Sequence, residues 1–63
     1  MDRIKVNYTV IYKGDETLDL TPGEKYECIG EVYTKDGELH DLAIIDESGE
    51  DYLYDPDDFE KVK

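Results

Sequence analysis

The sequence predicts an all-β protein with five short strands and one 3₁₀ turn before the last strand. Apolar and polar residues alternate over several short stretches, which is typical of strands that bury one face. Clusters of Gly, Pro, Asp and Ser separate these stretches and predict turns. A chain of 63 residues has room for one core, so residues 1–63 are expected to form a single domain. Five short strands in one domain indicate a small barrel.

The first strand is predicted over residues 4–12, where apolar side chains occupy every second position. Residues 13–24 then break the alternation. Within them Pro22 presets a turn and Gly23 can supply a positive φ. We therefore expect a long ordered loop after the first strand.

The middle of the chain predicts two hairpins. Alternating apolar residues indicate a second strand over Lys25–Tyr33, in which Gly30 marks a bulge or bend. The pair Asp36-Gly37 tolerates positive φ at both central positions of a tight turn. The third strand, Leu39–Ile45, is therefore expected to run antiparallel to the second. A further turn at 46–49 leads into a fourth strand that begins at Asp51.

The end of the chain predicts a 3₁₀ turn and a last short strand. Pro56 has no N–H to extend a central ladder, and the aspartates around it suit one helical turn. We predict this turn over residues 55–58 and the last strand over residues 59–62.

This order of parts resembles an SH3 domain. Residues 18–26 (LDLTPGEKY) look like the diverging turn of that fold, and residues 54–59 (YDPDDF) look like its Tyr-Ile-Pro-Ser-Asn-Tyr element. Residues 43–54 (AIIDESGEDYLY), followed by Phe59, are similar to a segment of small uncharacterised SH3-like proteins of bacteria and their phages. The resemblance implies a single five-stranded SH3-like barrel of that origin, and it implies no activity.

The same resemblance implies a groove. In SH3 domains aromatic residues and one proline receive an extended peptide, and acidic residues of the long loop attract its Arg or Lys. Carried over to this chain, the groove residues are Tyr12, Pro56 and Phe59, and the loop acids are Asp15, Glu16 and Asp19. Tyr8 is the other candidate for the first-strand aromatic, but Tyr12 adjoins the loop. The chain has no tryptophan, whereas the SH3 groove normally has one, and this counts against a polyproline ligand.

Charge is segregated along the chain. The formal net charge is −11, and 11 Asp and Glu lie between Asp36 and Glu60 without any Lys or Arg. Adjacent hairpins would gather these acids into one negative surface that steers basic partners; the alternative is that they serve only solubility. Direct binding to nucleic-acid phosphates or anionic lipid is not expected. The residues assigned to the acidic surface are Asp46, Glu47, Glu50, Asp51, Asp55, Asp57 and Asp58.

The residue inventory predicts no catalytic, metal or cofactor site. His40 is expected at the surface, with no neighbouring Ser or Cys to activate. Cys28 shares the alternation of Tyr26, so both are expected in the core. The carboxylate spacing matches no EF-hand loop. One of Tyr52 and Tyr54 is expected to pack inward, which requires a bulge because alternation puts both on one face.

The sequence therefore predicts a non-enzymatic module that binds a basic or extended segment of another protein. The longest apolar run, residues 42–45, is far shorter than a membrane span. The lone cysteine excludes an internal disulfide and no segment resembles a signal peptide, so a cytoplasmic monomer is expected. Two alternatives remain open: an acidic inhibitor that imitates DNA, and a small subunit that completes a larger assembly.

Overall fold

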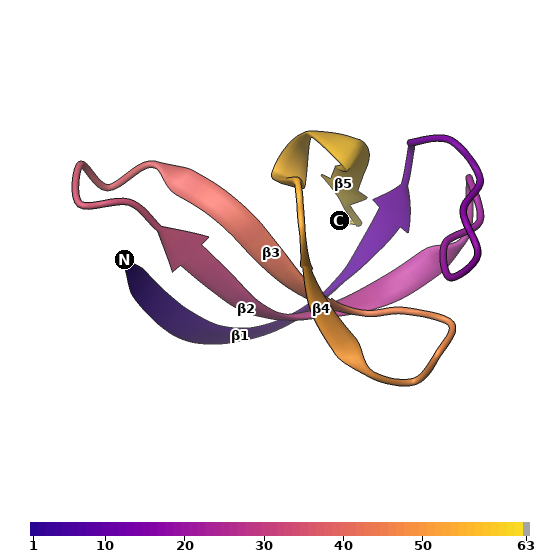
Figure 1. Cartoon of the computed structure of the whole chain (residues 1–63), viewed down its shortest axis with the longest axis horizontal. Coiled ribbons are helices and arrows are strands. Elements are labelled where there is room, and N and C mark those ends of the chain that lie inside the picture. The colour runs from indigo at the N-terminus through magenta and orange to yellow at the C-terminus, as the bar shows by residue number, and fades with distance from the viewer. Residues whose placement is uncertain (63) are drawn as a thin grey trace.

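The structure, a computed structural model, describes residues 1–62 and is all-β (Figure 1). Five strands form one antiparallel sheet in the order β4-β3-β2-β1-β5, and the 3₁₀ turn η1 lies between β4 and β5. This confirms the predicted class, the five strands and the 3₁₀ turn. The barrel is not closed, because no ladder joins β4 to β5 within residues 1–62. The elements are β1 (Asp2–Tyr12), β2 (Lys25–Tyr33), β3 (Leu39–Ile45), β4 (Asp51–Tyr54), η1 (Pro56–Asp58) and β5 (Phe59–Lys61).

Two hairpin turns connect the middle strands, and the first differs from the tight turn that the sequence predicts. The N–H of Gly37 donates to the carbonyl of Thr34, and the N–H of Gly49 donates to the carbonyl of Asp46, each at 3.0 Å. Both glycines have φ of 84°, whereas Asp36 has no positive φ. Each connection is thus a three-residue loop with one glycine in the left-handed region. The expectation of positive φ at both Asp36 and Gly37 was wrong.

The sheet contains three shifts of register, of which two lie near its centre and the third, in the β2–β3 pairing, lies between Val32 and Tyr33. The β1–β2 pairing shifts between Lys5 and Tyr8, and the β2–β3 pairing shifts between Cys28 and Gly30. The second shift confirms the predicted irregularity at Gly30. Since a bulge moves the following residues to the opposite face of the sheet, it changes which side chains of β2 face the core.

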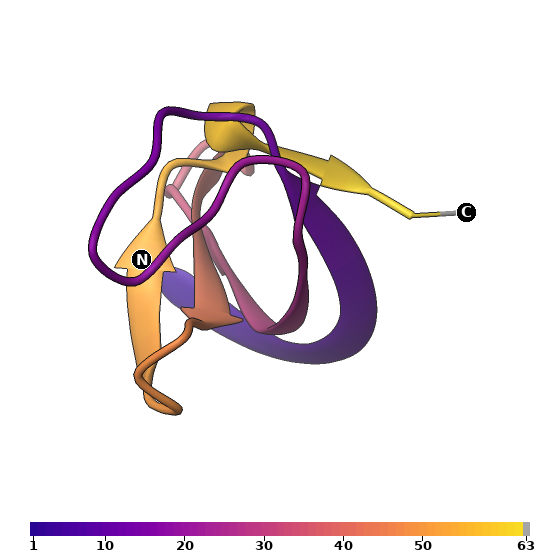
Figure 2. The same cartoon turned by 90° about the vertical axis from the view of Figure 1, so that its right-hand side faces the viewer.

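One hydrophobic core lies on the concave face of the curled sheet (Figure 2). Leu20 reaches this core from the loop of residues 13–24, which therefore belongs to the folded body. Tyr26 and Cys28 are buried, as predicted. Residues 1–62 contain no helix with the length and apolar character that a membrane crossing requires. The buried core cluster consists of Val10, Tyr12, Leu20, Tyr26, Cys28, Leu42, Ile44 and Phe59.

Tyr52 and Tyr54 differ in burial although the β3–β4 ladder between them is regular. Tyr52 pairs with Ile44 and is 51% exposed, whereas Tyr54 pairs with Leu42 and packs against the core. The expected bulge is absent from this described ladder. The difference arises instead because Tyr54 adjoins η1, where its ring contacts that of Phe59 at 5.9 Å between centroids.

Candidate functional site

The two aromatic residues of the expected groove are packed into the core. Tyr12 ends β1 and Phe59 begins β5, and the two are cross-strand partners with ring centroids 5.3 Å apart. Only 5% of Tyr12 and 7% of Phe59 is exposed. Pro56, which begins η1, is half-buried. So small a chain needs its aromatic side chains to fill the interior, and these rings do not form an open stacking surface.

Acidic residues from two segments lie beside Tyr12 at the end of β1. This hydroxyl donates to the carbonyl of Asp15 at 2.5 Å, and the N–H of Lys13 donates to the carbonyl of Asp58 at 2.7 Å. Burial, together with the negative charges of Asp58 and Asp15, raises the pKa of Tyr12. Glu16 is exposed beside Asp15. The loop of residues 13–24 and η1 thus form one acidic rim over the covered aromatic pair.

The loop also binds the turn of residues 46–50, which lies at the same end of the molecule (Figure 1). The N–H of Glu47 donates to the carbonyl of the half-buried Asp19 at 3.0 Å. The carboxylate of Glu47 accepts from the hydroxyls of Thr21 at 2.7 Å and Tyr26 at 2.5 Å. The bond from Tyr26, followed by that from Thr21, holds the pKa of Glu47 below its usual range. Glu47 therefore fastens the turn to the loop.

Asp46 does not belong to an exposed acidic surface. It is 5% exposed, and its carboxylate accepts from the hydroxyl and the N–H of Ser48 and from the hydroxyl of Tyr54 at 2.6 Å. Burial is the largest influence on Asp46 and opposes its ionisation, but these bonds outweigh it and hold the pKa below the usual value. The assignment of Asp46 to the surface was wrong, because the sequence pattern does not show which turn carboxylate the backbone folds over.

The other acids of the expected surface have different surroundings. Asp51 lies on β4 with its carboxylate 3.6 Å from the guanidinium of Arg3. Asp55 caps η1 by accepting from the N–H of Asp57 at 2.9 Å. Glu50, Asp57 and Asp58 are exposed. Of these acids, Glu50 lies in the turn of residues 46–50, Asp51 lies on β4, and the other three lie in or next to η1.

Sequence reasoning missed a second cluster, which we call the tyrosine–carboxylate cluster: Tyr8, Glu31, Tyr33 and Lys61. The hydroxyls of Tyr8 and Tyr33 donate to separate oxygens of Glu31, at 2.5 and 2.7 Å. The bond from Tyr8, then that from Tyr33, lowers the pKa of Glu31. The ammonium of Lys61 lies 4.3 Å from the centroid of the Tyr8 ring. A signal was available in Gly30, because a bulge there places Glu31 on the core side.

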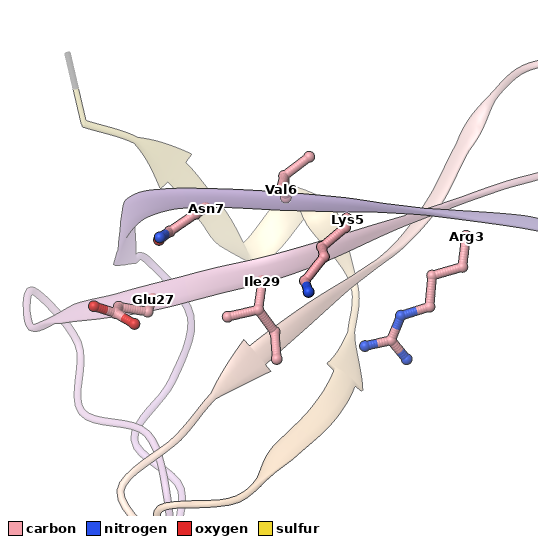
Figure 3. Close-up of a pocket in the computed structure, with 6 residues that line it drawn as sticks. All are labelled: Arg3, Lys5, Val6, Asn7, Glu27 and Ile29. Atoms are coloured by element: carbon pink, nitrogen blue, oxygen red, sulfur yellow. The ribbon is translucent and has the colours of Figure 1, made fainter.

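A shallow hollow lies on the face of the sheet that turns away from the core (Figure 3). Lys5, Glu27 and Ile29 project into it from β1 and β2. Arg3 lies across Gly30, where an added Cβ would be 3.0 Å from its Nε, and reaches Asp51 on β4. With Asp51 counted, the positive charges of Arg3 and Lys5 at the hollow are matched by two negative charges, those of Glu27 and Asp51. The hollow is lined by Arg3, Lys5, Val6, Asn7, Glu27 and Ile29.

His40 and Cys28, the two remaining residues with reactive side chains, belong to neither the acidic rim nor the tyrosine–carboxylate cluster. His40 is exposed, as expected, with its Nδ1 2.8 Å from the Oδ2 of Asp41. The thiol of Cys28 is fully buried and donates to the carbonyl of Gly30 at 3.3 Å. Among residues 1–62, no three His, Cys, Asp or Glu side chains gather closely enough to hold a metal ion.

In comparisons with known proteins, no family model, no curated protein and no solved structure matches this chain.

Proposed function

We propose that this chain is a non-enzymatic interaction module that binds a basic segment of another protein. One observation carries the proposal: backbone hydrogen bonds hold Asp15 of the loop and Asp58 of η1 beside the end of β1, and the negative charges of both raise the pKa of Tyr12. Within residues 13–24, 46–50 and 55–58, Lys13 is the one basic residue. A positively charged segment is attracted to such a surface and finds it faster.

Charge supplies most of the affinity in this proposal. Tyr12 and Phe59 are buried, so their faces offer a ligand little area for stacking. The half-buried ring of Pro56 supplies an apolar contact beside the acids. Interactions between exposed charges are screened once the Debye length, about 8 Å at physiological salt, falls below their separation. Binding is therefore expected to weaken as salt rises.

We also propose that the sheet is an SH3-like fold. The strand order, the long loop between β1 and β2, and the 3₁₀ turn between β4 and β5 support this proposal. Kinship with small SH3-like proteins of bacteria and phages rests on residues 43–54 and Phe59. We further propose that the chain acts as a monomer in the cytoplasm.

A titration of the labelled chain with a synthetic peptide of alternating arginine and proline tests the function by NMR. The amide signals of Asp15, Glu16, Asp57 and Asp58 should shift and saturate, and the shifts should shrink at high salt. A peptide with glutamine in place of arginine should leave these signals unmoved. Shifts concentrated on the β2–β3 turn, or an equal response to the glutamine peptide, would overturn the proposal.

A matched pair of charge variants sharpens this test. The double variant Asp15→Asn, Asp58→Asn removes two charges from the acidic rim and should weaken binding of the arginine peptide about two- to tenfold, the range for two exposed charge contacts. The control, Asp36→Asn with Glu38→Gln, removes the same charge from the exposed β2–β3 turn and should change the affinity far less. Equal losses in both variants would mean that only net charge matters.

The geometry gives less support to an inhibitor that imitates DNA. Such a protein needs many free carboxylates in rows that follow phosphate positions. Here Asp46 is buried, and Glu47 and Asp55 accept hydrogen bonds that hold the turn and η1 in place. A flexible basic segment requires no such regular spacing.

A further inference from the structure

The tyrosine–carboxylate cluster has the composition of a receptor for a cation. Glu31 supplies a negative charge, and the ring of Tyr8 supplies a π face, which attracts ammonium groups. The two phenol hydroxyls take two of the roughly four acceptor positions of the carboxylate. Acceptor positions thus remain for a further donor. Tyr8, Glu31 and Tyr33 are each half-buried, so a ligand can reach them from solvent.

The bulges in the sheet place these groups together. Beyond the shift at Gly30, Glu31 pairs with Ile4 on one side and with Leu42 on the other. Leu42 belongs to the buried core, so Glu31 lies on the core side of the sheet. Tyr33, two residues along the same strand, shares that face. Tyr8 reaches Glu31 from β1 because the register of β1 also shifts just before it.

The cluster already holds one cation, and that cation comes from the chain itself. The ammonium of Lys61 lies 4.3 Å from the centroid of the Tyr8 ring, within the range of a cation–π contact. Lys61 ends β5, a three-residue edge strand that, within residues 1–62, pairs with β1 alone. Its side chain is exposed. The ring of Tyr8 and the charge of Glu31 attract this lysine, and a competing cation would be attracted by the same two groups.

We propose that Tyr8, Glu31 and Tyr33 form a binding site for the alkylammonium group of a lysine from a partner protein, with Lys61 as its exchangeable internal occupant. The site shares no residue with the acidic rim of Asp15 and Asp58. It therefore stands independently of the proposed function.

A single lysine with both ends blocked, Nα-acetyl-lysine N-methylamide, is the probe, and NMR of the whole chain is the measurement. In the wild-type chain the probe should shift the ring signals of Tyr8 and Tyr33. It should also move the ε-methylene signals of Lys61 toward those of a free lysine, because the displaced side chain leaves the ring. A purely structural Lys61 contact would leave these methylene signals in place.

Two lysine variants with equal net charge separate occupancy of the site from general attraction. Lys61→Gln should bind the probe about two- to fivefold more tightly than the control Lys25→Gln, the size expected for removal of one competing cation–π contact. Glu31→Gln should weaken binding by a similar factor. Asp15→Asn should not weaken it, so failure here and failure of the peptide titration are distinguishable. Equal affinities of the two lysine variants, or shifts only in the acidic loop, would overturn the proposal.

The wild-type measurement keeps the proposal falsifiable even if Glu31→Gln fails to fold. Unmoved Lys61 and Tyr8 signals at saturating probe would be sufficient to reject the site.

Discussion

Asp46 is held by donors from two places in the chain. Ser48 supplies its N–H and hydroxyl from within the turn, and Tyr54 supplies its hydroxyl from the end of β4. The carboxylate therefore fixes the shape of the turn and joins it to the aromatic contact between Tyr54 and Phe59. Asp46 therefore has a structural role, and it stabilises the end of the molecule where the acidic rim lies.

The variant Asp46→Asn should destabilise the fold. The amide keeps one acceptor oxygen but turns an NH₂ group toward donors, which leaves a buried donor unsatisfied. The expected cost is about 1–3 kcal/mol of unfolding free energy, measured by urea unfolding. Glu50→Gln is the control, because Glu50 is exposed in the same turn and should change stability by less than about 0.5 kcal/mol. A neutral Asp46→Asn would show that the three bonds contribute nothing net.

The contribution of Asp46 should also depend on pH. Its pKa is lower in the folded chain than the ordinary value of 3.8, so the unfolded chain binds the proton more readily. The stabilisation is therefore complete above the unfolded pKa and is lost as pH falls through the lower folded pKa. The stability difference between wild type and Asp46→Asn should be constant near neutral pH and shrink below about pH 4. A difference that grows on acidification would contradict this assignment.

At the scale of elements, the β3–β4 turn depends on the left-handed conformation of Gly49, whose φ is 84°. An alanine there should cost about 1–2 kcal/mol, because its Cβ crowds the following carbonyl in this conformation. An asparagine tolerates the left-handed region better, so Gly49→Asn should cost less than Gly49→Ala. Apart from Gly49 and its two chain neighbours, no atom of residues 1–62 lies within 4 Å of a Cβ built at this position, so the cost arises in the local backbone and not from another part of the fold. Urea midpoints of the two variants check the order, and the reverse order would refute it.

Strand β2 illustrates how much of the candidate site the sequence can predict. Its bounds, Lys25–Tyr33, follow from alternation and are found in the structure. The irregularity at Gly30 is also predicted. Its consequence for Glu31 is not, because strict alternation with Tyr26 and Cys28 turns Glu31 away from the core. The face of the sheet on which a side chain lies depends on the pairing of the strands, so it is known only once the register is known.

For the expected groove residues, too, the sequence predicts the position in the chain but not the packing of the side chains. The sequence locates Tyr12, Pro56 and Phe59 correctly at the ends of β1 and β5 and in η1. It cannot show whether the rings of Tyr12 and Phe59 face solvent or each other. That depends on how far the open sheet curls and on how the loop covers them, which are properties of the complete fold.

At the scale of the whole molecule, self-repulsion of the acidic residues acts across its full size. The chain carries a formal charge of −11 within extents of 31 × 22 × 19 Å. The Debye length is about 30 Å at 0.01 M salt and about 3 Å at 1 M. At low salt nearly every pair of charges therefore interacts, and at high salt only neighbours do.

Stability should consequently rise with sodium chloride. Between about 0.01 and 0.5 M salt, the unfolding free energy in urea should increase by on the order of 1–3 kcal/mol. Replacing the exposed Glu16 by lysine should stabilise the chain at low salt and reduce the salt effect. A fall in stability with salt would mean that favourable ion pairs such as Arg3 with Asp51, 3.6 Å apart, outweigh the repulsion.

The register shift at Gly30 depends on one extra residue in β2. Cys28 pairs with Ile44 and Gly30 pairs with the adjacent Ala43, so Ile29 is the extra residue of the bulge. Deletion of Ile29 would leave a regular ladder in which Glu31 still pairs with Leu42 on the core side. A single-codon deletion would therefore remove the bulge and leave the side chains beyond it on their present faces.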